Sequence, residues 1–101
     1  MSTREIHVQT GDKVAIPNGR AVMVAIWPGT EHSQPRKTAR VEAYVDGIWV
    51  AGAAVLDDDR NESLVPQTLT VFVPRSADGG SLVFSGQTPA KVVLTTFPLD
   101  S

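Results

Sequence analysis

The side chains that most often carry chemistry are few in this chain and lie far apart. Cysteine is absent, and histidine occurs only at His7 and His32. Transition-metal sites are built from clustered histidine and cysteine ligands. A Ser-His-acid hydrolase places its nucleophile in a recognisable turn beside an oxyanion loop. Neither pattern surrounds either histidine, so we expect no catalytic residue, no metal and no cofactor, and an enzyme built around His32 is the least favoured alternative.

Oxygen ligands concentrate only in the acidic segment 57–62, which reads DDDRNE. An EF-hand calcium loop requires glycine at its sixth position and a bidentate glutamate at its twelfth. Counted from Asp57, those positions hold Glu62 and Thr68. We interpret the segment as a solvated turn, and a calcium site in this loop is the less favoured interpretation.

Charge and hydropathy exclude further classes of function. The net charge is −2, with six basic and five acidic residues in positions 1–50 and three and six in positions 51–101. Nucleic-acid binding depends on a basic surface, so we expect no nucleic-acid partner. The longest apolar runs, 21–27 and 48–56, fall short of the ~20 residues that cross a bilayer, and the N-terminus lacks the apolar stretch of a signal peptide. We expect a chain made in the cytoplasm, with no membrane association and no export by a signal peptide.

The residue pattern predicts an all-β protein. Short runs rich in β-branched and aromatic residues alternate with glycine, aspartate, asparagine and proline, and no window shows the apolar period of a helix. A chain of 101 residues suffices for one hydrophobic core. Residues 1–101 are therefore predicted to form a single antiparallel β-sandwich or jelly roll of about eight short strands. The strands are predicted at 5–10, 13–17, 20–27, 38–46, 48–55, 67–74, 81–85 and 91–97.

The stretch AYVDGIWV, residues 43–50, predicts a hairpin with a two-residue Asp-Gly turn. Such a turn fixes the pairing, so Tyr44 is expected opposite Trp49 and Ala43 opposite Val50. Side chains alternate between the two faces of a strand. The predicted register puts Val41, Ala43, Val45, Ile48 and Val50 on the core face and Arg40, Glu42, Tyr44, Trp49, Ala51 and Ala53 on the outer face.

The outward aromatic pair, Tyr44 and Trp49, has three interpretations that the sequence leaves open. It is a cross-strand contact that stabilises the hairpin by about 0.2 to 1 kcal/mol, part of a protein–protein surface, or a platform on which a sugar or base stacks. Nearby, Arg36, Lys37 and Arg40 form a small basic cluster. This cluster suits an acidic protein surface, and a solvated loop base explains it equally well.

Two strands carry more apolar residues than a small sandwich can bury. The segments 20–27, RAVMVAIW, and 48–56, IWVAGAAVL, are nonpolar on both faces. A strand with one wet face alternates between apolar and polar residues, and a sandwich of this length has a single core layer. The tail 96–101, TFPLDS, adds further apolar side chains. We therefore expect a second subunit or another protein to cover the surplus.

No motif identifies a family. In general character, a small cysteine-free β-sandwich with surplus apolar surface and no catalytic residues is similar to small structural proteins of bacteriophage virions, in particular capsid decoration or cement proteins. The resemblance implies a non-enzymatic module, incorporated into a virion, that self-associates as a homo-oligomer or docks on a capsid or other large assembly. The alternative is a carbohydrate- or small-ligand-binding sandwich that uses the Tyr/Trp platform. The predicted interface residues are Trp27, Tyr44, Trp49, Phe97, Leu99, Arg36, Lys37 and Arg40.

Overall fold

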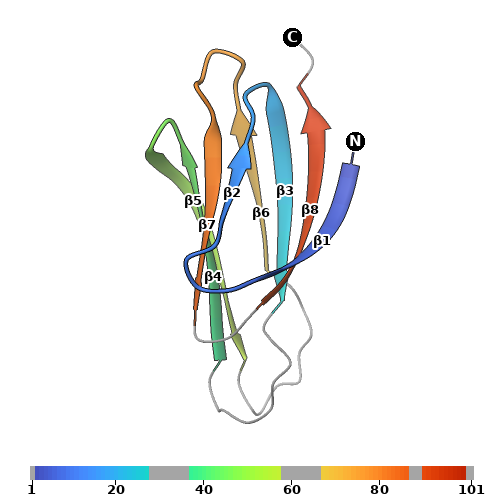
Figure 1. The fold of residues 1–101 in the computed structure, drawn as a ribbon, viewed down its shortest axis with the longest axis vertical. Helices are drawn as coiled ribbons and strands as arrows, with labels where there is room; N and C mark the ends of the chain where they lie inside the picture. The colour runs from blue at the N-terminus through green and yellow to red at the C-terminus, as the bar shows by residue number, and fades with distance from the viewer. Residues whose placement is uncertain (1, 28–36, 58–66, 87–89, 100–101) are drawn as a thin grey trace.

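The computed structural model describes residues 2–27, 37–57, 67–86 and 90–99 of the chain. These residues form eight strands and no helix (Figure 1). Within the same ranges, no helix is long and apolar enough to cross a membrane. The strands are β1 (Ser2–Val8), β2 (Lys13–Ile16), β3 (Arg20–Trp27), β4 (Lys37–Val45), β5 (Ile48–Asp57), β6 (Gln67–Val73), β7 (Gly80–Gly86) and β8 (Ala90–Pro98).

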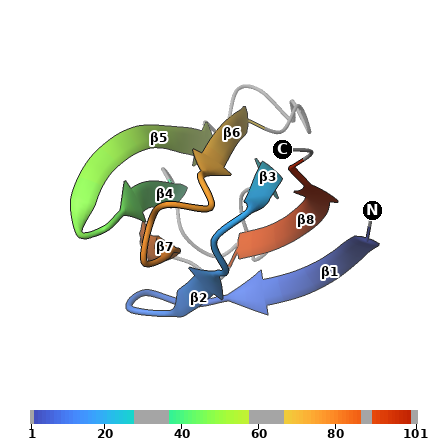
Figure 2. The same cartoon turned by 90° about the horizontal axis from the view of Figure 1, so that it is seen from above.

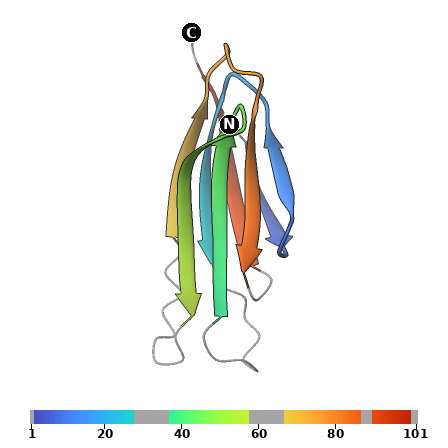
Figure 3. The same ribbon diagram turned by 90° about the vertical axis from the view of Figure 1, so that its left-hand side faces the viewer.

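The strands form two antiparallel sheets that pack face to face (Figure 3). The first sheet has the order β1-β8-β3-β6, and the second has the order β2-β7-β4-β5. Strands of the first half pair with strands of the second half in reverse order: β1 with β8, β2 with β7, β3 with β6 and β4 with β5. The chain is therefore one long antiparallel ribbon that turns at β4–β5 and is rolled up by the additional pairs β3–β8 and β4–β7. This order is that of an eight-stranded jelly roll, and the predicted all-β sandwich is confirmed.

The core lies between the two sheets and follows from the alternation of side chains along each strand. In β3, Val22, Val24 and Ile26 are buried, whereas Met23 between them is exposed. The second sheet contributes Leu82 and Phe84 from β7 to the same core. Phe84, Ile26 and Leu82 are among the largest fully buried side chains, so the two layers are held together chiefly by apolar burial.

All eight predicted strands are present, and no end shifts by more than three residues. The strand β3 has the predicted bounds, and β5 extends two residues further than predicted, to Asp57. The strand β1 begins three residues earlier than predicted because Ser2 to Val8 pair continuously with β8. Its sequence shows no apolar alternation over Ser2 to Glu5, so only the neighbouring strand makes that part extended.

The β4–β5 hairpin departs from the predicted register at one residue. Tyr44 pairs with Trp49 as predicted, but Ala43 pairs with Ala51 rather than with Val50. Val50 is thus the extra residue of a β-bulge. A one-residue shift exchanges the two faces of every residue that follows it.

The predicted division of β5 into a core face and an outer face was consequently wrong. Ala51 and Ala53, predicted outside, pack against the core. Val50, predicted inside, is 46% exposed because it is the bulged residue. Ile48 was also predicted inside and is 68% exposed, because the start of β5 curves away from the other strands (Figure 2). The prediction was correct for Val41 and Ala43, which are fully buried, and Val45 is partly buried.

Candidate functional site

The predicted interface residues that the structure describes fall on two opposite sides of the sandwich. Trp27 and Phe97 belong to β3 and β8, in the first sheet. Tyr44, Trp49 and Arg40 belong to the β4–β5 hairpin, in the second sheet. The structure therefore does not bring them into one site, and each outer face is described in turn.

The outer face of the first sheet is half apolar. Of the fourteen side chains that the strand register places on it, seven are apolar and four are threonines. Phe97, Ala21 and Phe72 are neighbours in one row across β8, β3 and β6. Phe72 is 63% exposed and Met23, one row further along β3, is 44% exposed. Exposed apolar side chains that lie next to each other are one of the features from which interaction sites are inferred.

The charged groups on this face are paired within the chain. The Lys91 ammonium lies 3.3 Å from a Glu5 carboxylate oxygen and 4.8 Å from the centroid of the Trp27 ring. Trp27 is accordingly half-buried beneath a cation, an arrangement in which the ring quadrupole attracts the charge. His7 is the third ionisable residue of the face. With histidine neutral, the face carries no net charge, so it does not repel another apolar surface.

The outer face of the second sheet is organised around the Trp49 side chain. The Trp49 indole N–H donates a hydrogen bond to Glu42 Oε2, and Arg40 Nε lies 3.9 Å from Glu42 Oε1. A Cβ added at Gly52 would lie 2.6 Å from Glu42 Oε2 and 3.4 Å from a Trp49 ring carbon. Only glycine therefore leaves room for this contact. Trp49 is fixed in place and still 56% exposed, while Tyr44 is half-buried.

The tip of the same hairpin is tied to the neighbouring connection. Asp46 and Gly47 have φ values of 52° and 78°, the left-handed conformation that the predicted two-residue turn requires. The Asp46 carboxylate accepts hydrogen bonds from the backbone N–H groups of Asp78 and Gly79, at 2.8 and 3.2 Å. The Asp46 N–H donates to the Gly79 carbonyl at 3.0 Å. Asp46 thus fixes the position of the hairpin that presents Trp49.

The apolar tail is attached to its own chain. The Leu99 N–H donates to the Gly19 carbonyl at 3.0 Å, and the Leu99 carbonyl accepts from Arg75 Nη2 at 3.2 Å. Leu99 is half-buried in this position. These contacts keep Phe97, two residues earlier, in the row beside Ala21.

Several sequence predictions lie outside the described residues. They concern Arg36, His32 and the acidic positions 58–62. Lys37 lies at the start of β4, and its side chain is likewise not among those described. Among the described residues, no group of three or more histidine, cysteine or acidic side chains is placed to hold a metal ion.

The sequence reasoning missed four exposed apolar residues. Phe72 and Met23 lie on the first sheet, and Ile48 and Val50 lie at the hairpin tip. In β6, TVFV, the alternation indicated that Phe72 and its two valine neighbours point to opposite faces. This alternation would have identified Phe72 as an aromatic residue on the outer face, if the sequence had also shown that only one face of β6 packs against the core.

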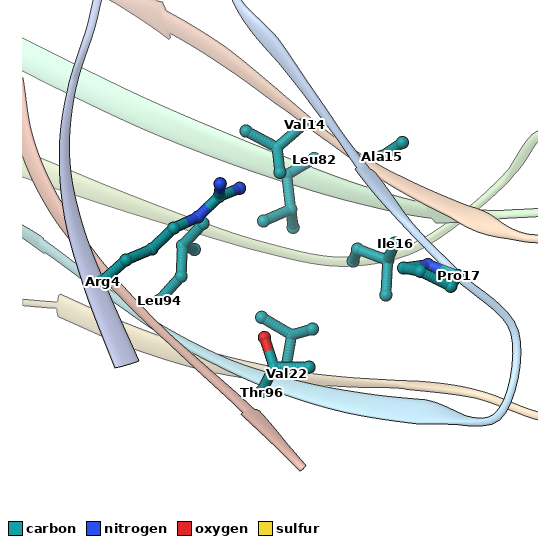
Figure 4. A pocket seen from close by; sticks show the side chains of 9 residues that line it. All are labelled: Arg4, Val14, Ala15, Ile16, Pro17, Val22, Leu82, Leu94 and Thr96. Atoms are coloured by element: carbon teal, nitrogen blue, oxygen red, sulfur yellow. The ribbon is translucent and has the colours of Figure 1, made fainter. Parts of the chain in front are cut away.

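A small cavity lies between the two sheets, on the side formed by β1 and β2 (Figure 4). Its volume is about 40 Å³, and its lining is largely apolar, with Arg4 and Thr96 as the polar side chains. Ligand pockets measure about 300 to 1,000 Å³. This cavity is too small for a sugar or a cofactor.

Comparison with known proteins gives no assignment: no protein-family model matches this chain, and neither does any curated protein. Any functional conclusion therefore depends on the geometry described above.

Proposed function

We propose that this chain is a non-enzymatic structural module that associates with itself or docks on a larger protein assembly. The surface proposed to do this is the outer face of the first sheet. Binding energy comes from burying apolar side chains there, and it stabilises the assembled state by mass action. The observation that carries the proposal is the pair of exposed side chains Phe72 and Met23, beside the partly buried Phe97 and the buried Ala21, on a face without net charge.

The size of the exposed side chains supports a protein partner. Aromatic residues and methionine are enriched at the centres of protein interfaces, where charged residues are depleted. Fully burying a phenylalanine or methionine side chain stabilises by about 1.5 to 3 kcal/mol. Burial of Phe72 and Met23 would therefore supply part of the binding free energy. The four threonines on the same face can form hydrogen bonds to water or to the partner at the edge of the interface.

The most specific form of the proposal is a bacteriophage capsid decoration protein. Its support is the jelly-roll order of the strands, which also occurs in viral capsid domains and in lectins. A fold does not establish a function, so this form is the weaker part of the proposal. Genes for a major capsid protein, a portal or a terminase beside the gene of this chain would support it, and unrelated neighbouring genes would count against it.

The test is to replace Phe72 with glutamate and to measure association by sedimentation velocity over a wide concentration range. Phe72 is largely exposed, so Phe72→Glu leaves the core intact. We expect the wild-type chain to associate and Phe72→Glu to weaken that association by about tenfold or more, as truncation of an interface anchor does.

Ile48→Glu is the matched control, because Ile48 is as exposed as Phe72 but lies at the tip of the hairpin in the second sheet. We expect Ile48→Glu to associate like the wild type. A wild-type chain that stays monomeric at every concentration, or equal association of Phe72→Glu and the wild type, would contradict the proposal.

Sugar binding at Trp49 is the second candidate function, and the fixed position of the Trp49 ring favours it. An exposed ring held by Glu42 over Gly52 suits stacking, and the Arg40–Glu42 pair supplies polar groups beside it. Millimolar sugars would then quench tryptophan fluorescence in the wild type and not in Trp49→Ala. Unchanged fluorescence with a panel of neutral hexoses and pentoses would rule against this candidate.

A further inference from the structure

The strand β1 offers a free backbone edge for another strand. The first sheet ends at β1 and β6, and the second at β2 and β5. β5 and β6 contact each other across the sandwich, which closes that side. β2 has four residues and is followed by Pro17. β1 has seven residues with no proline and no bulge, and among the described strands it pairs with β8 alone, at the outer position that Figure 1 shows. An edge with these properties is a template for pairing with another chain.

We propose that two copies of this chain pair through their β1 edges, antiparallel, about a two-fold axis perpendicular to the sheet. Such pairing joins two first sheets into one continuous eight-stranded sheet. The inference rests on the proposed function, because this symmetry puts the two apolar outer faces side by side on the same surface. The dimer then presents a doubled docking surface.

Charge and the length of the paired segment together select one register: an axis at Ile6 pairs five residues of β1, whereas an axis at Thr3 or His7 pairs three. In an antiparallel pair, two residues directly opposite each other have their side chains on the same face of the sheet. The two-fold axis must therefore pass midway between one residue of β1 and the same residue of the second copy. An axis at Arg4 or at Glu5 puts like charges opposite each other, which is destabilising. An axis at Ile6 puts the two Ile6 side chains together and Glu5 opposite His7 of the second copy, twice. We therefore assign Ile6 to the axis.

Arg4 disfavours indiscriminate pairing of other chains with this edge. Its side chain points toward the cavity between the sheets (Figure 4). Inward-pointing charges on edge strands are a known protection against indiscriminate pairing. In the Ile6 register, Arg4 lies opposite Val8 of the second copy and meets no like charge. The same residue therefore disfavours other registers and tolerates this one.

The area of the outer face also favours the dimer. Four strands about 4.8 Å apart, over the seven rows from Trp27 to Ala21, give a face of roughly 400 Å². A specific interface buries about 800 Å² per partner. One chain alone thus has about half the area that stable docking needs, and two chains joined at β1 have about all of it.

The first test uses charge reversal and restoration. Glu5 is exposed, so Glu5→Lys changes the edge without touching the core. We expect Glu5→Lys to raise the dimer dissociation constant by about tenfold, because the Glu5 carboxylate can accept a hydrogen bond from an imidazole N–H of His7 of the second copy, at two places, and a lysine cannot accept one. The double variant Glu5→Lys/His7→Glu puts a lysine opposite a glutamate at both places and should restore dimerisation. Dimerisation unaffected by Glu5→Lys, or not restored in the double variant, would overturn the proposed register.

The second test uses the absence of cysteine from the chain. A single cysteine at the axis faces its own mate, with Cα atoms about 4.5 to 5.5 Å apart, which a disulfide can span. Ile6→Cys should therefore form a disulfide-linked dimer under mild oxidation, and Glu5→Cys should not. Crosslinking of Glu5→Cys but not of Ile6→Cys would place the axis elsewhere. Crosslinking of neither, in folded protein, would overturn pairing at this edge.

The two proposals fail in different ways. Face-to-face packing of two dimers would give a tetramer, and Phe72→Glu should abolish that step while leaving the β1 dimer. If Glu5→Lys has no effect but Phe72→Glu lowers association, the edge pairing is wrong and the docking face is supported. If the β1 dimer forms but Phe72→Glu changes nothing further, the edge pairing is supported and the docking face is wrong.

Discussion

Asp46 shows how much a single residue can do in this fold. It adopts a positive φ, begins the two-residue turn and accepts two backbone hydrogen bonds from the β6–β7 connection. The sequence predicted the first two roles from the Asp-Gly pair alone. The third role was not predictable, because it depends on which strands become neighbours after the ribbon has rolled up.

We predict that Asp46→Ala lowers the free energy of unfolding by about 2 kcal/mol, since it removes charge-assisted hydrogen bonds and strains a left-handed residue. Asp46→Asn is the matched variant, because asparagine tolerates a positive φ and keeps an oxygen at the same place. Its loss should be below about 1 kcal/mol. Urea unfolding followed by circular dichroism measures both, and equal losses would contradict the role assigned to the carboxylate oxygen.

The strands β3 and β5 show where prediction at the scale of an element succeeds and where it fails. In β3, the sequence predicted the strand bounds and a surplus of apolar residues on both faces, although it did not single out Met23. In β5, the run IWVAGAAVL is apolar at almost every position, so neither register is penalised by the sequence. The sequence therefore could not predict the bulge at Val50. It also could not predict that Trp49, Glu42 and Gly52 lie close together.

We predict that deletion of Val50 is severely destabilising, by more than about 3 kcal/mol. Without the bulge, the partly buried Ala51 and Ala53 and the buried Val55 would turn outward, and Gly52 and Ala54 would turn inward. The control is Val50→Thr, which keeps the residue count and should cost less than about 0.5 kcal/mol at this exposed position. Thermal unfolding distinguishes the two, and similar stability of the deletion and the control would contradict the bulge.

At the scale of the whole molecule, the jelly-roll order decides which predicted residues can act together. Periodicity and turn residues predicted eight strands, but they did not predict the partner of each strand, because pairing across the chain depends on long-range contacts. Trp27 and Phe97 therefore share a face with Phe72, whereas Trp49 lies on the opposite side. The sequence could not show that the predicted interface residues lie on two different faces, and their role in an interface stays a prediction.

The same order explains why the first sheet, rather than the second, is the proposed docking face. The second sheet has its exposed tryptophan engaged by Glu42 over Gly52. The first sheet has Met23 and Phe72 exposed, and its charges are already paired with each other. Charged groups that are paired with each other lose less when water is removed from them than unpaired charges would.

The methyl group of Met23 reports on that docking face more closely than any other probe in the chain. Met23 lies beside the row of Phe97, Ala21 and Phe72 and is exposed in the single chain. Its methyl resonance can be assigned with Met23→Leu and followed by NMR as the protein is concentrated. We predict that the resonance shifts and broadens as sedimentation shows association, because aromatic rings of a second molecule approach it. An unchanged Met23 resonance in a sample that sedimentation shows to be fully associated would contradict the assignment of the docking face.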